Sequence, residues 1–469
     1  MNRAGDGARL MKGAVVTALA SHRPADARGF FGHPAGLGYL SFTEAWERFS
    51  YYGMTSLLAL YMVQQLLAPG HAENVLGLGA LRGVFETRGP ISNQAFASLI
   101  FGWYSGLVYF TPILGGIIAD RWLGARRTVV IGALLMSAGH IAMAFDASFL
   151  IALLLLICGS GCLKGNISAQ VGRLYPEDDE SRRTQGYTIF SAAINIGAVL
   201  GPLACGALAA IYGWHYGFAL AGALMILALC IYLAGQRHLA DGGVKTERIE
   251  YPPLTLAERR RTWMLILVIL LTVLPNIAYP MIWNIGIIWV SEHVSLATPL
   301  GDVPASWFNS VDAFASIVAV PPLVAFWRWQ AKRGREPGDV GKIALGSALT
   351  GVSALVVALG ALVTPAGSRA AVYWPLISFA GMGIAFLYFW PVLLALISQA
   401  APPKANATLM GGAFLSLFAG SVLMGWVGSF YGEMSPAVFW TFDAAIGFAG
   451  GLLVLLLKPQ IEKVLTAQD

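Results

Sequence analysis

The sequence is poor in charged residues. Only 12% of its 469 residues are Asp, Glu, Lys or Arg, about half of the roughly 25% typical of soluble domains. In contrast, 57% are hydrophobic. This balance argues against a soluble chain. The net charge of +5 implies no nucleic-acid partner, because the basic residues gather where membrane topology places them.

Cysteine and histidine are also scarce. All four cysteines are predicted to lie in apolar segments and none in an external loop, which argues against a disulfide framework and a metal site: Cys158, Cys162, Cys205 and Cys230. None of the seven histidines is paired with another at a spacing of four residues. The sequence thus offers no metal-ligand motif or nucleophile-base arrangement of an enzyme, and we expect no cofactor. We also find no soluble domain that could give a signalling output, which argues against a receptor.

Apolar runs of about 20 residues recur along the chain, each long enough to cross a bilayer as a helix. The pattern predicts an all-α polytopic membrane protein with twelve spans, of which those near 280 and 391 contain prolines that should kink them. The predicted spans are 36–67, 94–119, 127–145, 147–170, 185–211, 214–235, 263–290, 305–328, 341–364, 371–399, 405–430 and 436–457.

The distribution of basic residues sets the predicted orientation. With the N-terminus inside, 25 of the 30 Lys and Arg fall on cytoplasmic segments, as the positive-inside rule requires. Arg82, Arg88 and Arg369 fall outside, and Arg48 and Lys164 fall within spans. Both termini are therefore predicted to be cytoplasmic, as tails 1–35 and 458–469. The polar N-terminal tail does not resemble a cleaved signal peptide, so the first span should itself direct insertion.

A hydrophilic linker divides the chain into two equal halves. Residues 236–262 combine Gly-Gly and Pro-Pro pairs with dense charge, which is typical of a cytoplasmic linker. Six spans precede it, in 36–235, and six follow it, in 263–457. Basic clusters at 119–127 and 327–336 occupy the same position in each half, a weak sign of an internal repeat.

Three ionisable side chains interrupt the first span, in the stretch TEAWERFSYY. Glu44, Glu47 and Arg48 share one face of a helix, and each would cost about 2.5 to 3.5 kcal/mol if unpaired at mid-membrane. One guanidinium cannot neutralise two carboxylates. One glutamate is thus expected to take up a proton readily or to borrow a second cation, for which Lys164 in the fourth span is the candidate. The alternative is a static buried ion network that only fixes helix packing.

Aromatic and polar side chains lie in the same or neighbouring spans. Tyr51 and Tyr52 follow Arg48 by one turn, Tyr104 lies in the second span and Asn195 in the fifth. An asparagine at mid-span is costly without a partner, so Asn195 is the stronger candidate for substrate contact. In the second half, Asp312 in the eighth span could line a cavity, or it could be a capped carboxylate or one at the membrane interface.

These stretches together resemble a known family. Residues 44–53, EAWERFSYYG, look like the ExxERFxYYG signature of proton-dependent oligopeptide transporters in the major facilitator superfamily. Three further blocks agree: GGIIADRWLGARRT at 115–128, GSGCLKGNIS at 159–168 and FSAAINIGAVLGP at 190–202. The first of these supplies candidate gating and loop residues, namely Gly115, Asp120, Arg121 and Gly124.

The resemblance implies a fold of two six-helix bundles and a function. The function would be proton-coupled import of di- and tripeptides by alternating access, with protons as the only coupling ion, across a plasma membrane, here the bacterial inner membrane. Glu44 and Glu47 would handle protons, and Arg48 and Lys164 would hold the peptide carboxylate. Tyr51, Tyr52 and Asn195 would contact the peptide, and we add Tyr104 of the second span as a further candidate for substrate binding. The protein is expected to act as a monomer in contact with lipid.

The second half departs from the family pattern. The family usually has a glutamate five residues before a proline of the tenth span, which binds the peptide ammonium, whereas Phe386 stands five residues before Pro391. The eleventh-span block has lost its tryptophan, and Gly165 replaces the usual proline after Lys164. Most bacterial members also carry two extra helices between the halves, which this chain lacks.

Two hypotheses follow from the missing glutamate. An ammonium in a low-dielectric cavity needs an anionic or strongly polar partner, so Asp312, where the family usually has asparagine, could bind it. Alternatively, no amine is bound, and the substrate is an anion or a non-peptide compound held by Arg48 and Lys164.

Overall fold

The computed structural model describes residues 28–87, 89–176, 179–239, 252–299 and 301–465. Within these ranges the helices are joined by loops, and the only named strands form two small hairpins. The described residues exclude Arg88, most of the tail 1–35 and the centre of the linker 236–262.

Helices of the first half follow a short hairpin, β1 (Arg28–Phe30) and β2 (His33–Pro34). They are α2 (Ala35–Tyr61), the π-helix η1 (Met62–Leu66), η2 (Ala72–Asn74), α3 (Leu78–Phe85), α4 (Asn93–Ile118), the π-helix η3 (Ala119–Leu123), α5 (Gly124–Ala142), η4 (Asp146–Ser148), α6 (Phe149–Gly172), α7 (Glu180–Tyr212), α8 (Trp214–Gly235) and η5 (Gln236–His238).

Helices of the second half begin after the linker. They are α9 (Leu256–Leu271), α10 (Val273–Ala278), η6 (Tyr279–Trp283), α11 (Ile285–His293), η7 (Ala305–Phe308), α12 (Asn309–Lys332), α13 (Asp339–Val363), α14 (Tyr373–Ala400), α15 (Pro403–Gly428), η8 (Tyr431–Glu433) and α16 (Pro436–Leu465), with the hairpin β3 (Ala297–Thr298) and β4 (Gly301–Asp302) before η7.

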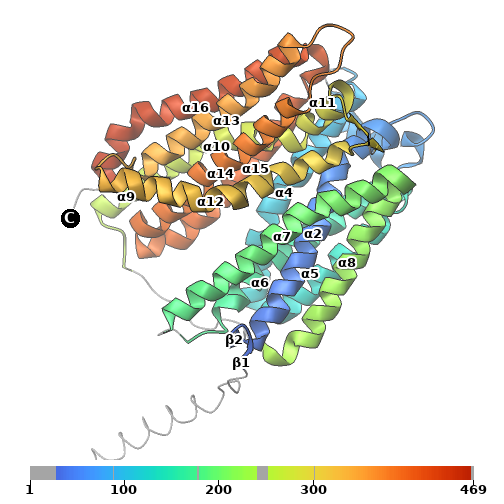
Figure 1. Cartoon of the computed structure of the whole chain (residues 1–469). Helices are drawn as coiled ribbons and strands as arrows, with labels where there is room; N and C mark the ends of the chain where they lie inside the picture. Colours follow the sequence, from blue (N-terminus) through green and yellow to red (C-terminus); the bar gives the residue numbers. More distant parts are fainter. Residues whose placement is uncertain (1–27, 88, 177–178, 240–251, 300, 466–469) are drawn as a thin grey trace, which may run out of the picture.

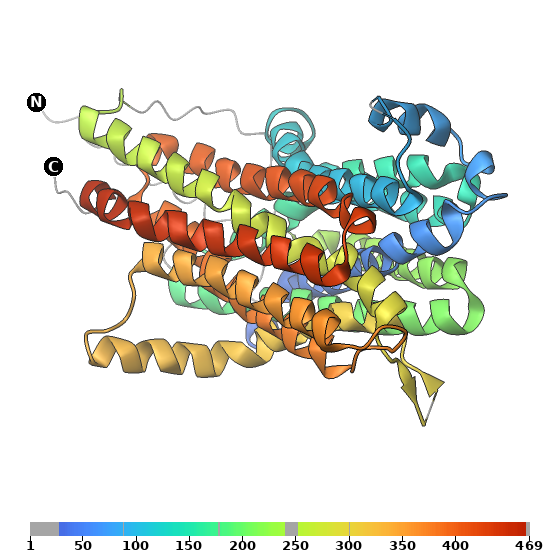
Figure 2. The same cartoon turned by 90° about the horizontal axis from the view of Figure 1, so that it is seen from above.

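The long helices form two groups (Figure 1). In the N-terminal group α2 packs against α7 and α8, and α6 packs against α4 and α5. In the C-terminal group α13 packs against α14 and α16, and α14 packs against α12. Figure 2 shows α3 and the β3–β4 hairpin at one end of the molecule, and the start of α9 and the end of α16 at the other.

Ten segments of the described chain are long and apolar enough to cross a membrane. One of them, Asn93–Ala142, contains two of the predicted spans and is divided at Gly124, whose φ of +73° favours glycine. The helix α2 is not among the ten, and it is the helix that carries Glu44, Glu47 and Arg48. The structure therefore supports a membrane-spanning all-α fold and does not by itself confirm the predicted count of twelve.

Proline breaks the segment predicted as the seventh span. Its second part is divided into α10, which contains Pro275, η6, which contains Pro280, and α11. Proline interrupts a regular helix because it lacks the N–H that the helix needs. Thr255 caps α9 together with Glu258, so this helix begins inside the predicted linker. Pro391, in contrast, lies within the continuous helix α14.

The two groups meet tightly at the end where α3 lies. A Cβ atom on Gly102 of α4 would lie 2.6 Å from the Cα of Gly425 in α15, so only glycine permits this approach. Ser98 Oγ donates to the Gly425 carbonyl at 2.9 Å. Between η7 and α7, Trp307 Nε1 donates to the Leu203 carbonyl at 2.8 Å.

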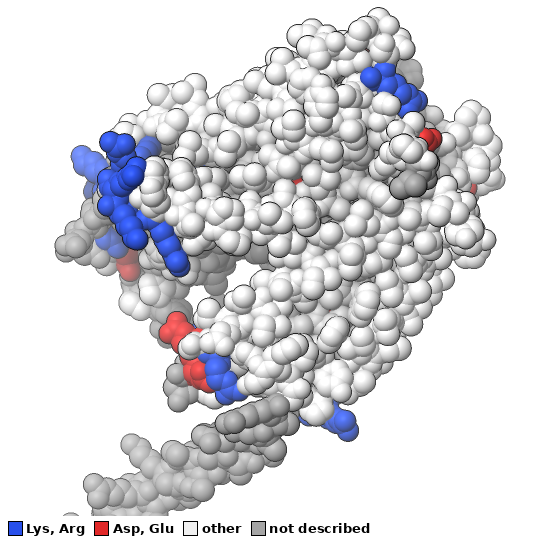
Figure 3. All heavy atoms as spheres, in the orientation of Figure 1, with Lys and Arg blue, Asp and Glu red and all other residues white. Residues whose placement is uncertain are grey.

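The groups separate toward the end where α9 begins and α12 ends (Figure 3). Figure 3 shows the surface hollowed between them on the side where α9 begins and α12 ends, and Lys and Arg gather there on the face shown. We call this end the basic end, and the end where α3 lies the opposite end. The broad surface between the two ends is almost free of charge on this face (Figure 3).

Candidate functional site

Helices α2 and α7 approach each other closely around the motif of the first span. A Cβ atom on Gly197 would lie 2.4 Å from the Ala45 carbonyl oxygen, and one on Gly201 would lie 2.5 Å from the Phe49 carbonyl oxygen. These glycines, from the block FSAAINIGAVLGP, let α7 cover the face of α2 that carries Arg48. The sequence thereby buries three ionisable side chains between helices.

Glu44, Glu47 and Arg48 form one buried ion cluster. Arg48 Nε lies 3.0 Å from Glu44 Oε1 and also pairs with Glu47 Oε2. The side chains of Arg48 and Glu44 are 4% exposed and that of Glu47 is 0% exposed. Among the described residues, Glu44 Oε2 and Glu47 Oε1 have no hydrogen-bond partner. Each carboxylate thus keeps one oxygen that could take a proton.

Lys164 reaches the same region from α6. Its Nζ lies 4.8 Å from the ring centre of Tyr51 and 4.8 Å from that of Tyr109, within the range of a cation–π contact. Arg48 lies 5.4 Å from the ring centre of Tyr51. Tyr51 therefore contacts both cations, and the structure brings the ion cluster and Lys164 close together.

A cavity of about 250 Å³ lies between the two groups of helices. Tyr51, Tyr52, Asn195 and Asp312, four of the predicted substrate-binding residues, line it. Its other lining residues are Thr55, Phe101, Ser105, Tyr109, Ala198, Tyr279, Pro280, Trp283, Ala313, Ser316, Ile317, Val320, Phe386, Leu387 and Ser421. Side chains from both halves of the chain thus meet around one partly polar space.

Asp312 is held in the cavity wall by several donors. Its Oδ2 accepts hydrogen bonds from Tyr279 Oη at 2.8 Å and from Trp283 Nε1 at 3.3 Å, and its Oδ1 accepts from the Ala313 N–H at 2.7 Å. The residue is 2% exposed. These donors orient the carboxylate, but among the described residues no Lys or Arg forms an ion pair with it. A cationic group of a ligand would supply the missing charge.

Phe386 occupies the position at which the family usually has glutamate. Its ring stacks on Tyr279 with centroids 5.0 Å apart and an interplanar angle of 28°. Tyr52 of α2, which also lines the cavity, packs against Trp283 with centroids 5.6 Å apart. Phe386 therefore supports, through Tyr279, the hydrogen bond that Asp312 receives.

The remaining predicted binding residues lie outside the cavity wall. Glu44, Glu47, Arg48 and Lys164 are not among the lining residues of the described chain and lie behind Tyr51. Tyr104, which was predicted to contact substrate, is 2% exposed within α4 and is likewise not among them. Tyr51 thus separates the charges from the open space in this conformation.

The predicted gating residues belong to α4, η3 and the start of α5. A Cβ atom on Gly115 would lie 2.0 Å from the Gly161 carbonyl oxygen, so this glycine allows close packing of α4 on α6. Asp120 and Arg121 lie in η3, and Gly124 follows with its positive φ. None of the four lines the cavity.

Tyr279 and Trp283 were missed by sequence reasoning. Both lie in η6, the short 3-10 helix that contains Pro280 and ends just before Asn284. An aromatic residue in an apolar span is often only an interface anchor, so their contacts with Asp312 had no separate signal. The Pro280 break could have marked this segment as a binding element, because broken helices often line transporter sites.

Comparison with known proteins decides the family. The sequence profile described as POT family matches residues 126–251 and 254–441. A di-/tripeptide transporter of Lactococcus lactis subsp. cremoris is 30% identical over 93% of this chain and 97% of its own length. The chain belongs to the POT family.

Further POT relatives cover most of the chain. The peptide transporter YePEPT of Yersinia enterocolitica is 26% identical over 92% of this chain and 95% of its own length. A peptide transporter POT in complex with sulfate is 27% identical, with a TM-score of 0.83 over 94% of this chain and 97% of that one. A POT family transporter in complex with 5-aminolevulinic acid is 25% identical, with a TM-score of 0.81 over 92% of this chain and 98% of that one. The predicted resemblance is confirmed, and the protein is a membrane transporter.

Proposed function

We propose that this POT family member is a proton-coupled symporter that imports di- and tripeptides by alternating access. The observation that carries the proposal is the cavity between the two groups of helices, with Asp312 in one wall and Tyr51, backed by Arg48 and Lys164, in another. A short peptide has an ammonium at one end and a carboxylate at the other. The cavity offers an anion for the first and two cations near the second. Names of relatives, such as the di-/tripeptide transporter of L. lactis, support this substrate class.

Asp312 is the proposed partner of the peptide ammonium. Three donors, from Tyr279, Trp283 and Ala313, hold this carboxylate in the cavity wall. A charged hydrogen bond from the ligand would supply the cation that a buried carboxylate needs. The bound 5-aminolevulinic acid of one structural neighbour likewise carries an amine and an acid in one small molecule.

Arg48 and Lys164 are the proposed partners of the peptide carboxylate. Both contact the ring of Tyr51, which lines the cavity. A small rotation of this ring gives the carboxylate access to both cations. Tyr52 and Asn195 then contact the peptide backbone from the same wall.

The proton site is proposed to be the pair Glu44 and Glu47. A proton on either carboxylate weakens its ion pair with Arg48, which frees the guanidinium to hold the substrate. Substrate and proton thus enter together from the outward-open state, and the halves then rock around the cavity. The inward gradient supplies the work, since one charge moving through 100 mV contributes about 2.3 kcal/mol.

The proposed topology has twelve spans and cytoplasmic termini in the bacterial inner membrane. It consists of a tail 1–35, bundles at 36–235 and 263–457 joined by the linker 236–262, and a tail 458–469. The basic end (Figure 3) is then cytoplasmic under the positive-inside rule. In this orientation the structure is closed toward the outside and hollowed toward the cytoplasm. The protein is proposed to work as a monomer without a cofactor.

The alternative is a proton-coupled transporter of a non-peptide or anionic metabolite on the same fold. Phe386 favours it, because this chain places an apolar ring where the family usually has the glutamate that binds the ammonium. Competition for uptake separates the two. We expect dipeptides to compete at least about tenfold better than their N-acetylated forms or simple carboxylates, because acetylation removes the charge that Asp312 binds. Equal competition by all three would support the alternative.

A further inference from the structure

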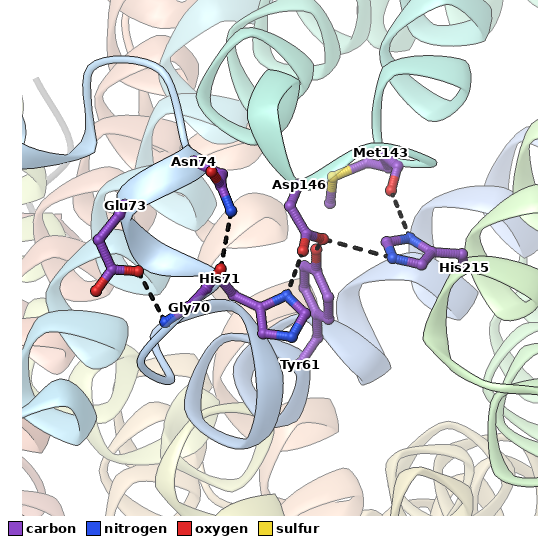
Figure 4. A network of polar contacts seen from close by, with 8 residues as sticks. All are labelled: Tyr61, Gly70, His71, Glu73, Asn74, Met143, Asp146 and His215. Carbon is purple, nitrogen blue, oxygen red and sulfur yellow. Dashed lines mark hydrogen bonds and ion pairs between the residues drawn. The ribbon is translucent and has the colours of Figure 1, made fainter.

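A second cluster of ionisable groups lies in the N-terminal group of helices and includes none of the residues that line the cavity. Figure 4 shows this cluster from close by. Its centre is Asp146, in the turn between α5 and α6. Tyr61 Oη, at the end of α2, donates to Asp146 Oδ1. His71 Nδ1 lies 2.6 Å from Asp146 Oδ2, and His215 Nε2, at the start of α8, lies 3.4 Å from Asp146 Oδ1. The Asp146 carboxylate therefore connects its own turn with three other segments of the chain.

The two ring nitrogens of His215 both face oxygens that only accept hydrogen bonds. Nδ1 lies 3.3 Å from the Met143 carbonyl oxygen, and Nε2 faces the Asp146 carboxylate (Figure 4). A neutral imidazole carries one N–H and can satisfy only one of them, whereas an imidazolium carries two and satisfies both. Only the charged form of His215 can therefore make both contacts at once.

His71 behaves differently in the same cluster. Only its Nδ1 faces Asp146, so a neutral ring with its proton on that nitrogen already makes the contact. The loop that carries His71 is fixed by local bonds: Glu73 Oε2 accepts from the Gly70 N–H, and Asn74 Nδ2 donates to the Gly70 carbonyl. His215 is thus the member whose contacts change most on protonation.

The cluster is open to solvent but has an apolar floor. The side chains of His71, His215 and Asp146 are 46%, 37% and 18% exposed, so protons from that side of the membrane reach them. Beneath them the ring of Tyr61 packs edge-to-face against those of His215 and Phe218, with centroids 5.9 and 5.1 Å apart. The rings of Phe149 from α6 and Trp214 from α8 also pack on Tyr61.

The charges around His215 are few within the described chain. The titratable side chains in contact with Asp146 are Tyr61, His71 and His215, and Glu73 points to the Gly70 backbone instead (Figure 4). The segment between α2 and α3, which carries His71 and which we call the outer segment, also contacts the turn that contains Asp146. There the Leu76 N–H donates to the Ala147 carbonyl at 3.0 Å. A change at Asp146 is therefore felt by α2, α8 and this outer segment together.

We propose that Asp146, His71 and His215 form a proton-binding site, separate from Glu44 and Glu47, that clamps the end of the N-terminal group when His215 is charged. Histidine changes charge between about pH 5 and 8. Both contacts of His215 can form at once while its ring is charged and Asp146 is ionised, and one of them is lost when the ring is neutral. That these protons come from outside the cell rests on the proposed orientation.

A double-mutant cycle on the purified full-length protein tests the site without using transport. Thermal unfolding is measured at about pH 5.5 and about pH 8 for the original protein, for His215→Gln, for Asp146→Asn and for the double variant. We expect a coupling between the two positions of about 1 °C or more at the acidic pH that falls by at least half at the alkaline pH. A coupling of equal size at both pH values, or none at either, would overturn the proposal.

Two further variants test whether the effect depends on the charge at position 215 and on its contact with Asp146. His215→Lys keeps a charge at both pH values and should bring the melting temperatures at the two pH values closer together than in the original protein. His293→Gln is the matched control: His293 lies at the end of α11 and packs on Trp289, so its cycle with Asp146→Asn should show no coupling. A dipeptide-induced shift in melting temperature that persists in His215→Gln would separate this clamp from the substrate site. Its loss would mean that position 215 acts through the cavity and would overturn the separate site.

Discussion

Tyr279 Oη donates a hydrogen bond of 2.8 Å to Asp312 Oδ2 in the wall of the cavity. The ring of Tyr279 also stacks on Phe386. Phe386 stands where the family usually has glutamate, so it contacts the tyrosine that orients the carboxylate of Asp312. This relationship connects the main departure of the sequence from its family with a specific anionic site. It also suggests how amine recognition could persist without the glutamate.

Replacing Asp312 by Asn should weaken dipeptide binding. The variant loses the negative charge that meets the ammonium, which is worth on the order of 1.5 to 3 kcal/mol, so KM for a dipeptide should rise about 10- to 100-fold. KM values from uptake into proteoliposomes provide the measurement. Unchanged KM for dipeptides would remove Asp312 from the site.

Tyr279→Phe should have a smaller effect in the same direction. It removes one donor to Asp312 and keeps the stack on Phe386, so we expect KM to rise by about three- to tenfold. Tyr388→Phe is the matched control, because Tyr388 lies on α14 and packs edge-to-face on Trp327 instead of lining the cavity. Equal effects of the two substitutions would argue against a specific role for the Tyr279 hydroxyl.

A charge swap tests whether Asp312 has taken over the function of the missing glutamate. Phe386→Glu alone places a second carboxylate near Asp312, and two like charges repel in a low-dielectric site. Combined with Asp312→Asn, the same change restores a single anion next to the cavity. We expect the double variant to recover about tenfold or more of the dipeptide affinity lost in Asp312→Asn, as measured by uptake competition. No recovery would mean that the two positions cannot serve the same ammonium.

Glu47→Gln should uncouple substrate exchange from the proton gradient. The amide keeps the size of the fully buried Glu47 side chain but can neither take up a proton nor pair with Arg48 as an anion. Gradient-driven accumulation should fall by about tenfold or more, while exchange of labelled for unlabelled dipeptide without a gradient continues. A variant that still accumulates substrate normally would exclude Glu47 as the coupling residue.

Gly102→Val should hinder closure at the end opposite to the basic end. Because a Cβ at Gly102 would lie 2.6 Å from the Gly425 Cα, the larger side chain costs about 1 to 3 kcal/mol in the closed arrangement. We expect slower uptake and greater labelling of a cysteine placed near this contact. Gly116→Ala on the same helix is the control, because nothing lies within 4 Å of its added Cβ. Similar uptake by both variants would contradict the tight-contact explanation.

Much of the candidate site could be predicted from sequence because ionisable residues are conspicuous in apolar spans. Glu44, Glu47 and Arg48 share a helix face through their spacing alone, and the structure places them in one cluster. Asp312 stood out for the same reason and lines the cavity. The cost of burying a charge in the membrane is the physical reason that such residues are informative.

Other features depend on tertiary contacts that leave no local pattern. Tyr279 and Trp283 resemble ordinary membrane aromatics until the broken helix η6 turns them toward Asp312. Tyr51 separates the ion cluster from the cavity, which spacing along α2 does not reveal. His71 and Asp146 lie 75 residues apart in different loops, and each alone looks like a solvated loop residue.

The most direct test of peptide symport is dipeptide accumulation in proteoliposomes that contain only this protein. With an inward proton gradient, labelled dipeptide should rise above its external concentration while the lumen acidifies, and with the gradient collapsed it should only equilibrate. Equal accumulation with and without the gradient, or no uptake of any dipeptide under either condition, would contradict proton-coupled peptide import.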